Sequence, residues 1–271
     1  MHEPVLLEDV LEILHIKRNS QVIDATTGMG GHTRAIARRG ARVLGIEADP
    51  EMLVLAEKSL KQLPRVKLVK GNFRNIAEIA LKNGVKRADA ILMDLGISRY
   101  HYKVLNRGFS FEKQGQPLDM RIDPGSQAVR ASDLVNAVGA RGLSEIFTKS
   151  QVKRVLAARK IKRLETVGDL LWVLGTTGRG KIHPATKPFM NLRIAVNSEL
   201  ENLAEALPQA YELLSEGGTL AVITFHSGED RIVKNFMKNK AMSLVLPTKE
   251  ETEKNKSARS AKLRYIRKNE T

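Results

Sequence analysis

Residues Val22–His32 have the sequence VIDATTGMGGH, and this segment sets the architecture of the chain. Its apolar start ends at Asp24 and indicates a buried strand, the glycines that follow indicate a tight turn, and Thr33–Ala37 opens a helix. A second apolar run, Val43–Ile46, ends in the acid Glu47. Glycines let the backbone approach a ligand, and an acid after the second strand holds ribose hydroxyls. The segment therefore predicts a nucleotide-type site on a doubly wound sheet.

The turn favours S-adenosylmethionine (SAM) over a dinucleotide as the ligand. Its glycines do not fit G-x-G-x-x-G, and Asp24 lies just before the loop. SAM has no pyrophosphate that needs to rest on a helix N-terminus, so it does not require the dinucleotide spacing. A dehydrogenase would need a dinucleotide turn and a hydride partner, and the sequence offers neither.

The order of the expected elements predicts an α/β fold, a Rossmann-like sheet of the class I SAM-dependent methyltransferase type with an inserted, smaller all-helical domain. Strands are expected at Val22–Asp24, Arg42–Glu47, Val66–Val69, Ala88–Asp94 and Thr219–Thr224, and the runs Met242–Leu246 and Leu263–Ile266 finish the sheet. Helices are expected at Thr33–Arg39, Pro50–Leu63, Ile76–Leu81, Leu192–Leu214 and Glu229–Lys238, with Gly217-Gly218 as the stop of the long helix.

The rhythm of strands and helices breaks between residues 104 and 189. This part has helical patterns around Ala131–Val138, Leu143–Phe147, Val152–Ile161 and Val167–Leu174. The predicted domains are therefore a discontinuous cofactor-binding domain, residues 1–103 and 190–271, and a helical insertion, residues 104–189, that recognises RNA. Lys249–Ser260 is expected to be mobile.

The charge of the chain favours a polyanionic partner. Lys and Arg number 45 against 30 Asp and Glu, which gives a net charge of +15 and a pI near 10. Lys149–Lys187 holds ten basic residues against Glu165 and Asp169, and a second basic run lies between Lys254 and Lys268. Each basic group that neutralises a phosphate releases counterions, so this clustering favours nucleic acid over a merely soluble surface.

Other features of the composition limit the kinds of metal site and the cellular location that we expect. There are no cysteines, which excludes disulfides and thiolate metal sites, and the six histidines lack zinc-ligand spacing, although a magnesium ion held by acids stays open. No apolar run is long enough to span a bilayer, and no leader pattern opens the chain. We expect a cytoplasmic protein with no membrane partner.

Three acids end expected strands. Parallel strands present their carboxyl ends at one edge of a sheet, so Asp24, Glu47 and Asp94 are expected to converge on one site there. The alternative is that each acid caps the helix that follows it. Three such acids beside a glycine-rich turn favour the site.

Nine motifs resemble, in order, those of one family, the bacterial 16S ribosomal RNA cytosine-N4 methyltransferases. They are His2–Leu7, Gly30–His32, Asp94–Gly96, Arg107–Phe111, Pro117–Arg121, His183–Thr186, Arg193–Leu200, Phe225–Ser227 and Glu229–Lys234. The resemblance implies a SAM-dependent enzyme that modifies a cytidine in the decoding centre of the small ribosomal subunit. Its implied partner is small-subunit rRNA or the 30S particle.

The resemblance also implies a set of cofactor contacts. They are Gly30, Gly31, His32, Glu47, Phe73, Asp94 and His101. Glu47 replaces the usual aspartate and lengthens the reach of the carboxylate, and His101 replaces a glutamine. The helical domain departs further, because Ile146–Gln151 lacks a Tyr-Gly-Glu-Glu-Arg-like stretch, so the core site is kept while the substrate surface has drifted.

The chemistry of amino methylation suggests roles for further residues. We expect Asp94 or the Leu95 carbonyl to accept from the N4 amino group, with Asp119 and Asn197 shaping the base pocket as further catalytic residues.

Four residues are expected to bind the substrate. Phe109 and Phe111 could stack on an extruded base, with Arg121 on a phosphate, or the two rings could anchor their loop to the core. His226, after the strand Thr219–Thr224, is placed at the substrate as a secondary contact, against the alternative of a structural hydrogen bond.

Two other functions stay open. A DNA amino-methyltransferase is disfavoured because the chain has no Asp/Asn-Pro-Pro-aromatic signature. A ribosome-assembly factor that binds rRNA with little turnover is the other alternative, because a fold does not determine a function.

Overall fold

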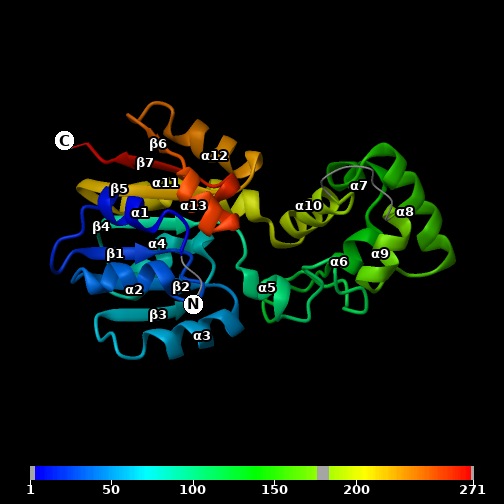
Figure 1. The fold of residues 1–271 in the computed structure, drawn as a ribbon, viewed down its shortest axis with the longest axis horizontal. Helices are drawn as coiled ribbons and strands as arrows, with labels where there is room; N and C mark the ends of the chain where they lie inside the picture. The colour runs from blue at the N-terminus through cyan, green and yellow to red at the C-terminus, as the bar shows by residue number, and fades with distance from the viewer. Residues whose placement is uncertain (1–3, 176–182, 270–271) are drawn as a thin grey trace. The chain divides into compact units, whose positions relative to one another are not determined.

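The computed structural model describes residues 4–175 and 183–269, and the chain divides into two compact units (Figure 1). The first unit comprises residues 1–96 and 200–271, and the second comprises residues 97–199. Both cuts lie outside the predicted domain borders, since residues 97–103 and 190–199 belong to the helical unit.

The first unit is built on a seven-stranded sheet with the order β3-β2-β1-β4-β5-β7-β6. Its first five strands are parallel, and β7 pairs antiparallel with β5 and β6. The strands are β1 (Gln21–Asp24), β2 (Arg42–Glu47), β3 (Val66–Lys70), β4 (Ala88–Asp94), β5 (Leu214–Thr224), β6 (Ser243–Val245) and β7 (Lys262–Arg267). The sheet confirms the predicted α/β class.

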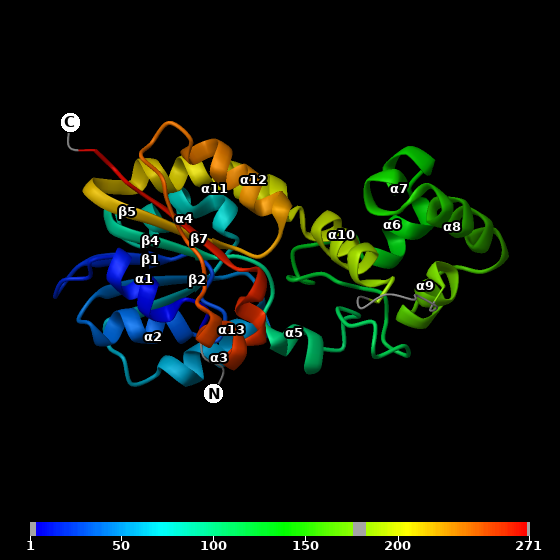
Figure 2. The same ribbon diagram turned by 45° about the horizontal axis from the view of Figure 1, so that its top comes forward.

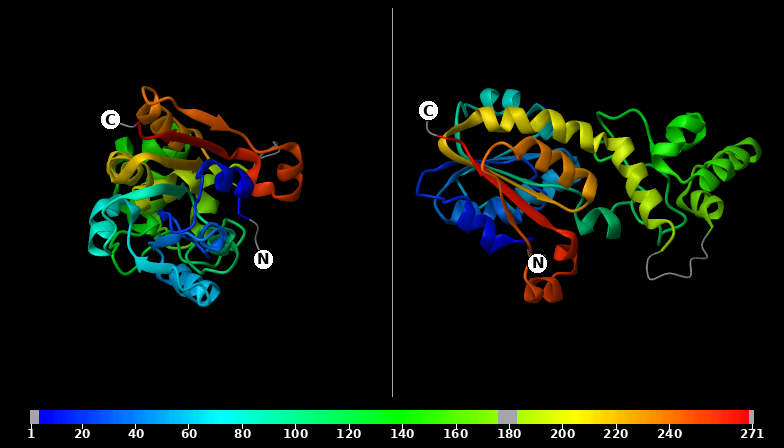
Figure 3. Two further views of the ribbon diagram at one scale, coloured as in Figure 1. Left: turned by 90° about the vertical axis from the view of Figure 1, so that its left-hand side faces the viewer. Right: turned by 90° about the horizontal axis from the view of Figure 1, so that it is seen from above.

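Helices cover both faces of this sheet, as the right-hand view of Figure 3 shows. Side chains of the central strands alternate between two cores: Ile91 and Met93 of β4 face the core formed with α4 and α11, and Ala90 and Leu92 face the core formed with α1 and α2. The helices of the unit are α1 (Leu7–Ile13), α2 (Gly31–Arg38), α3 (Pro50–Leu60), α4 (Ile76–Lys82), α11 (Glu199–Leu213), α12 (Ser227–Met237) and α13 (Lys249–Lys254), with 3-10 turns at Phe73–Asn75 and Lys256–Ser260.

The second unit is helical and has its own apolar core. Its helices are α5 (Arg99–Lys103), α6 (Ala131–Ala137), α7 (Ala140–Ile146), α8 (Lys149–Ile161), α9 (Val167–Leu174) and α10 (Thr186–Asn197). Side chains from α6 to α10 share this core, together with Phe109, Leu118 and Met120 from the long loop that precedes α6. Thr148 and Thr166 begin α8 and α9 as caps, and each pairs with the residue three positions later.

Three sequence expectations about these elements were wrong. The predicted helix Leu192–Leu214 is two helices, α10 and α11, because Ser198 has a left-handed backbone (φ 47°). Gly217-Gly218 does not stop a helix, since both glycines lie inside β5. Lys249–Ser260 forms α13 and a 3-10 turn, and Glu251 accepts a hydrogen bond from the Leu6 amide across the unit at 2.6 Å.

Candidate active site

The glycine turn lies between β1 and α2, as predicted. Gly30 is the residue before α2 and has φ 86°, a conformation that side chains rarely adopt. A Cβ atom on Gly30 would lie 2.7 Å from Leu60 Cδ1, and one on Gly31 would lie 2.6 Å from Pro4 Cγ. The positive φ favours glycine at position 30, and a side chain at either position would displace a neighbour; the backbone amides of the turn begin a helix whose dipole favours negative charge.

Glu47, at the end of β2, is tied to this turn. Its Oε2 accepts a hydrogen bond from the Gly28 amide at 2.7 Å, and its Oε1 accepts one from the Asp49 amide at 2.8 Å. Each carboxylate oxygen has a second lone pair, so the group can still accept from hydroxyls of a bound ligand. The extra methylene of glutamate lets the carboxylate reach the turn itself.

Asp24, at the end of β1, is fully buried beneath the turn. Thr33 Oγ1 donates to Asp24 Oδ2 at 2.6 Å, and the Thr26 amide donates to Oδ1 at 3.2 Å. Burial raises the pKa of Asp24, and these hydrogen bonds and the neighbouring His32 offset only part of that rise. Asp24 is therefore a carboxyl group that a nearby cationic ligand would stabilise in its charged form.

Asp94, at the end of β4, faces His32 of α2. His32 Nε2 lies 3.5 Å from Asp94 Oδ2, and the Asp94 amide donates to Thr26 Oγ1 at 2.7 Å. Among the described residues, neither ring nitrogen of His32 nor Asp94 Oδ1 has a hydrogen-bond partner, although all three atoms are buried. Buried polar atoms without partners are costly in proteins, so this corner is built for a polar ligand.

The three strand-end acids thus lie on adjacent strands, in the order β2-β1-β4. Glu47 and Asp24 both hold backbone amides of the β1–α2 turn, and His32 links that turn to Asp94. Sequence reasoning missed Thr26 and Thr33, whose hydroxyls fix Asp94 and Asp24. The signal was available in principle, because both hydroxyls flank the glycines in the same motif.

Two residues that the resemblance assigned to the cofactor stay predictions. Phe73 opens the 3-10 turn after β3 and is partly buried against the core of the first unit. His101 belongs to the second unit, where it is 5% exposed. Its Nδ1 lies 3.0 Å from Ser98 Oγ, and its ring meets the Phe109 ring edge-on, with the centroids 5.4 Å apart.

The two phenylalanines of the long loop pack inside the second unit. Phe109 is 4% exposed and belongs to the core, and Phe111 stacks on His183 with the ring centroids 4.6 Å apart. The edge of Phe111 also meets Phe189 of α10. Of the two roles considered from the sequence, this packing favours the anchoring of the loop over stacking on a base.

Arg121 is likewise engaged within its own loop. Its guanidinium makes a two-point contact with Asp119, at 2.7 and 2.8 Å, and donates to the Gln127 carbonyl at 2.8 Å. Burial acts to raise the pKa of Asp119, but the hydrogen bonds from Arg121 outweigh it and hold that pKa below its usual range. Asp119 is therefore a weak proton acceptor, and the guanidinium of Arg121 is engaged by Asp119 and Gln127, while its predicted phosphate contact stays a prediction.

Asn197, at the end of α10, is bonded on both sides of its amide. Oδ1 accepts from the Ile122 amide, and Nδ2 donates to the Met120 and Arg193 carbonyls, each at 2.8 Å. These bonds fix the loop that carries Asp119 and Arg121. Within the second unit, Asn197 and Asp119 thus hold the conformation of this loop, and their role in shaping the base pocket stays a prediction.

His226 is the cap of α12. Its Nδ1 accepts from the Glu229 amide at 3.4 Å, and Nε2 lies 3.2 Å from Glu229 Oε1. Glu229 is 2% exposed and accepts from the Phe225 amide at 2.8 Å. This arrangement favours the structural alternative for His226 over the predicted contact with substrate.

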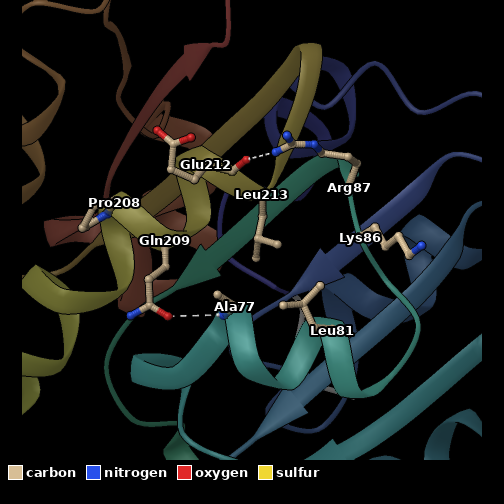
Figure 4. A pocket seen from close by; sticks show the side chains of 8 residues that line it. All are labelled: Ala77, Leu81, Lys86, Arg87, Pro208, Gln209, Glu212 and Leu213. Carbon is tan, nitrogen blue, oxygen red and sulfur yellow. Dashed lines mark hydrogen bonds between the residues drawn. The ribbon is translucent and has the colours of Figure 1, made fainter.

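An open, largely apolar groove lies between α4 and α11, at the amino end of β4 (Figure 4). Gln209 accepts from the Ala77 amide at 3.3 Å, and Arg87 donates to the Glu212 carbonyl. Since the acids follow the carboxyl ends of the strands, the groove is separate from the candidate site.

Among the described residues, no helix is long and apolar enough to cross a membrane.

Comparison with solved structures supports the fold. NSun6 from Pyrococcus horikoshii matches with a TM-score of 0.50 and 15% identity, over 99% of this chain and 53% of that chain. At this level of identity the likeness shows the fold alone, and it agrees with the predicted class.

Relatives found by sequence share a much higher identity with this chain. Two proteins named ribosomal RNA small subunit methyltransferase H match at 40% identity: that of Coprothermobacter proteolyticus over 98% of this chain and 96% of its own length, and that of Thermosipho melanesiensis over 97% and 96%. The model of the MraW methylase family matches residues 1–247. The resemblance found in the motifs is confirmed: the chain belongs to the MraW methylase family.

Proposed function

We propose that this protein transfers a methyl group from SAM to the N4 amino group of a cytidine in small-subunit rRNA, near the decoding centre. Its relatives are named for the methylation of small-subunit rRNA, and the net charge of +15 suits an RNA substrate. The observation that carries the proposal is the set of buried polar atoms of His32 and Asp94 at the glycine turn that have no hydrogen-bond partner within residues 4–175 and 183–269.

In this proposal each strand-end residue contacts one part of SAM. Glu47, which also holds the Gly28 amide, would accept from the ribose hydroxyls, and the tight turn at Gly30 and Gly31 would give the ligand access to the backbone. Asp24 and Asp94 supply negative charge for the cationic donor, and the His32 ring supplies a polar partner. Phe73 and His101 complete the proposed cofactor contacts.

The bound donor would supply an electrophilic methyl group on a sulfonium centre. The N4 amine of cytosine is a weak nucleophile, because its lone pair is delocalised into the ring. Asp94 Oδ1 is buried and has no partner among the described residues, so it is the proposed acceptor for an amino hydrogen, with the Leu95 carbonyl as the alternative. An acceptor there draws the nitrogen lone pair toward attack and receives the proton that leaves.

Most of the rate advantage is expected from positioning. Holding the amine and the methyl group close and in line supplies roughly 7–11 kcal/mol. Within the second unit, Asp119, Arg121 and Asn197 hold their loop in one conformation, and Phe109 anchors it. We propose that this ordered loop takes part in presenting the substrate, at the level of its backbone and shape.

The test combines binding with product mapping. Calorimetry measures SAM affinity, and labelled SAM is then incubated with unmodified small subunits, naked rRNA or duplex DNA, with mass spectrometry of the nucleosides. N4-methylcytidine confined to rRNA or subunits is the expected result. Label in DNA would favour a DNA amino-methyltransferase, and cofactor binding without methyl transfer would favour an assembly factor. In either of the rRNA-linked functions, we propose that the protein acts in the cytoplasm.

An Asp94→Asn variant tests the acceptor. We expect turnover to fall even at saturating SAM, because an amide oxygen is a weaker acceptor and cannot take the proton. SAM affinity should fall as well, because the variant removes a negative charge from the donor site. Full turnover in this variant would exclude Asp94 and leave the Leu95 carbonyl.

A further inference from the structure

Helix α8 carries positive charge only. Its thirteen residues include five basic side chains and no acid. Val152, Val155 and Ala158 face the core, while Lys149, Lys153, Arg154 and Lys160 are exposed. The outer face of α8 is therefore a row of cations without compensating charge on the same helix.

Helix α9 presents an aromatic ring to solvent. Trp172 is the only tryptophan of the chain, and it is 67% exposed, although five of the other seven residues of α9 are buried. Lys162 neutralises the one acid of the helix, Asp169, at 2.7 Å. A single exposed apolar side chain is common on protein surfaces, so a binding role for Trp172 depends on the cations that lie near this ring.

The two helices contact each other and belong to the same helical unit, where Figures 1 and 2 show them joined by a short connection. Near the start of α9, Lys162 pairs with Asp169, and just beyond its end Arg154 Nη1 lies 3.1 Å from the position of a Cβ atom on Gly175. Asp169 and Gly175 are each three residues from Trp172. Arg154 of α8 and Lys162, the residue after α8, therefore approach α9 about one turn away from Trp172, one on each side.

We propose that these two helices bind a single-stranded segment of the RNA substrate, with one unpaired base stacked on the Trp172 indole. Lys153, Arg154 and Lys160 contact the phosphates on either side, and the four residues form the basic-aromatic surface. The inference rests on the proposed function, which names RNA as the substrate, and adds a contact outside the loop of Asp119 and Arg121.

The chemistry of the surface selects this partner. Aromatic rings with neighbouring cations are the usual means of holding unpaired bases, because every base offers a π-face and every linkage a negative charge. Protein interfaces are instead depleted in lysine at their centres. A duplex offers no free base for stacking, so single-stranded RNA is the expected occupant.

The unique tryptophan makes the stacking directly measurable. The full-length protein is titrated with a short unstructured RNA while its tryptophan emission is recorded, and a blunt RNA duplex serves as the comparison. The single strand is expected to quench the emission strongly, and the duplex only weakly. Equal quenching by the two RNAs, or none by the single strand, would overturn the stacking.

Variants separate stacking from charge. Trp172→Ala is expected to weaken single-strand binding, followed by anisotropy of labelled RNA, by about 5- to 150-fold, which is the usual worth of one stacked base. Trp172→Phe should retain most of the affinity because it keeps a π-face. Unchanged affinity in Trp172→Ala, with an unchanged melting temperature, would refute the proposal.

Charge is tested by salt dependence. The pair Lys153→Gln with Lys160→Gln should lower the slope of log affinity against log salt by about 1.4, at ~0.7 for each phosphate contact on a single strand. The control pair is Lys234→Gln in α12 with Lys238→Gln just after it. Both lysines are exposed, so the pair removes the same charge and should leave the slope unchanged. Equal slopes in both pairs would refute a contact at α8.

Failure of this inference is distinguishable from failure of the proposed function. SAM affinity and methylation of small subunits are measured on the same preparations. If the parent protein methylates subunits normally and Trp172→Ala has the same RNA affinity and the same KM for subunits, only the proposed basic-aromatic surface is refuted. Absence of SAM binding or of rRNA methylation in the parent protein removes the proposed function itself.

Discussion

Replacing Glu47 by glutamine tests the link between the second strand and the glycine turn. The carboxylate accepts from two backbone amides, Gly28 at 2.7 Å and Asp49 at 2.8 Å. A glutamine can keep only one acceptor there, and its NH₂ group would face the other amide hydrogen. Hydrogen bonds to a charged group are worth about 1.5–3 kcal/mol, so the variant should lose about that much stability.

The expected loss has two readouts. The melting temperature should fall by about 3–12 °C, at ~2–4 °C for each kcal/mol in a unit of this size. Affinity for SAM should fall by about 10- to 150-fold, because a neutral amide accepts more weakly from ribose hydroxyls and no longer orders Gly28. Differential scanning fluorimetry and calorimetry measure the two effects.

The matched control is Glu57→Gln, which removes the same charge from the exposed face of α3. It should melt and bind like the parent protein. If Glu47→Gln also keeps the parent melting temperature and SAM affinity, the carboxylate neither orders the turn nor holds the cofactor, and the argument for this strand-end site fails.

Three further changes test other parts of the structure. Gly30→Ala should destabilise the first unit by about 2–5 kcal/mol, since alanine is strained at φ 86° and its Cβ would lie 2.7 Å from Leu60; a denaturant midpoint equal to that of the parent would contradict this. Asp24→Asn should raise the free energy of unfolding of the ligand-free protein at neutral pH, because burial raises the pKa of Asp24 and disfavours its charged form. A loss of stability in a urea titration at neutral pH would contradict this prediction. Burial acts to raise the pKa of Asp169, but hydrogen bonds from Lys162, Thr166 and Glu165 outweigh it and lower this pKa to about 2. The contribution of Asp169 to the free energy of unfolding is therefore present above pH 4 and is lost as the pH falls toward 2. Asp169→Asn should flatten this part of the stability–pH curve, and an unaltered curve would exclude the effect.

In the second unit, the local sequence pattern predicted the helices but not the packing of the long loop. The spacing of apolar residues predicted α8 and α9 nearly to their ends, because a buried helical face leaves a 3.6-residue period in the sequence. The same pattern could not show that Phe109 is buried or that Phe111 stacks on His183, since these contacts join segments far apart in the chain. Their roles were therefore open until the loop was placed.

Helix ends depend on contacts as well as on pattern. Residues Leu192–Leu214 are apolar at helical spacing throughout, yet the helix is interrupted at Ser198, where the backbone turns left-handed. Lys249–Ser260 is polar and looked mobile, but Glu251 bonds to the Leu6 amide, which lies 245 residues away in sequence. Neither a helix break without glycine or proline nor a distant hydrogen bond leaves a local signal.

The sequence alone determined the α/β class, the glycine turn and the strand-end acids Asp24, Glu47 and Asp94, because buried parallel strands and tight turns impose strict local choices of residue. Only the tertiary structure decided which of those groups are already satisfied. Arg121 is bonded within its own loop, and Asn197 of α10 bonds to that loop, while His32 and Asp94 keep buried polar atoms with no partner among the described residues. The physical reason is that burial and hydrogen bonding are properties of three-dimensional neighbours, and the chain order does not specify them.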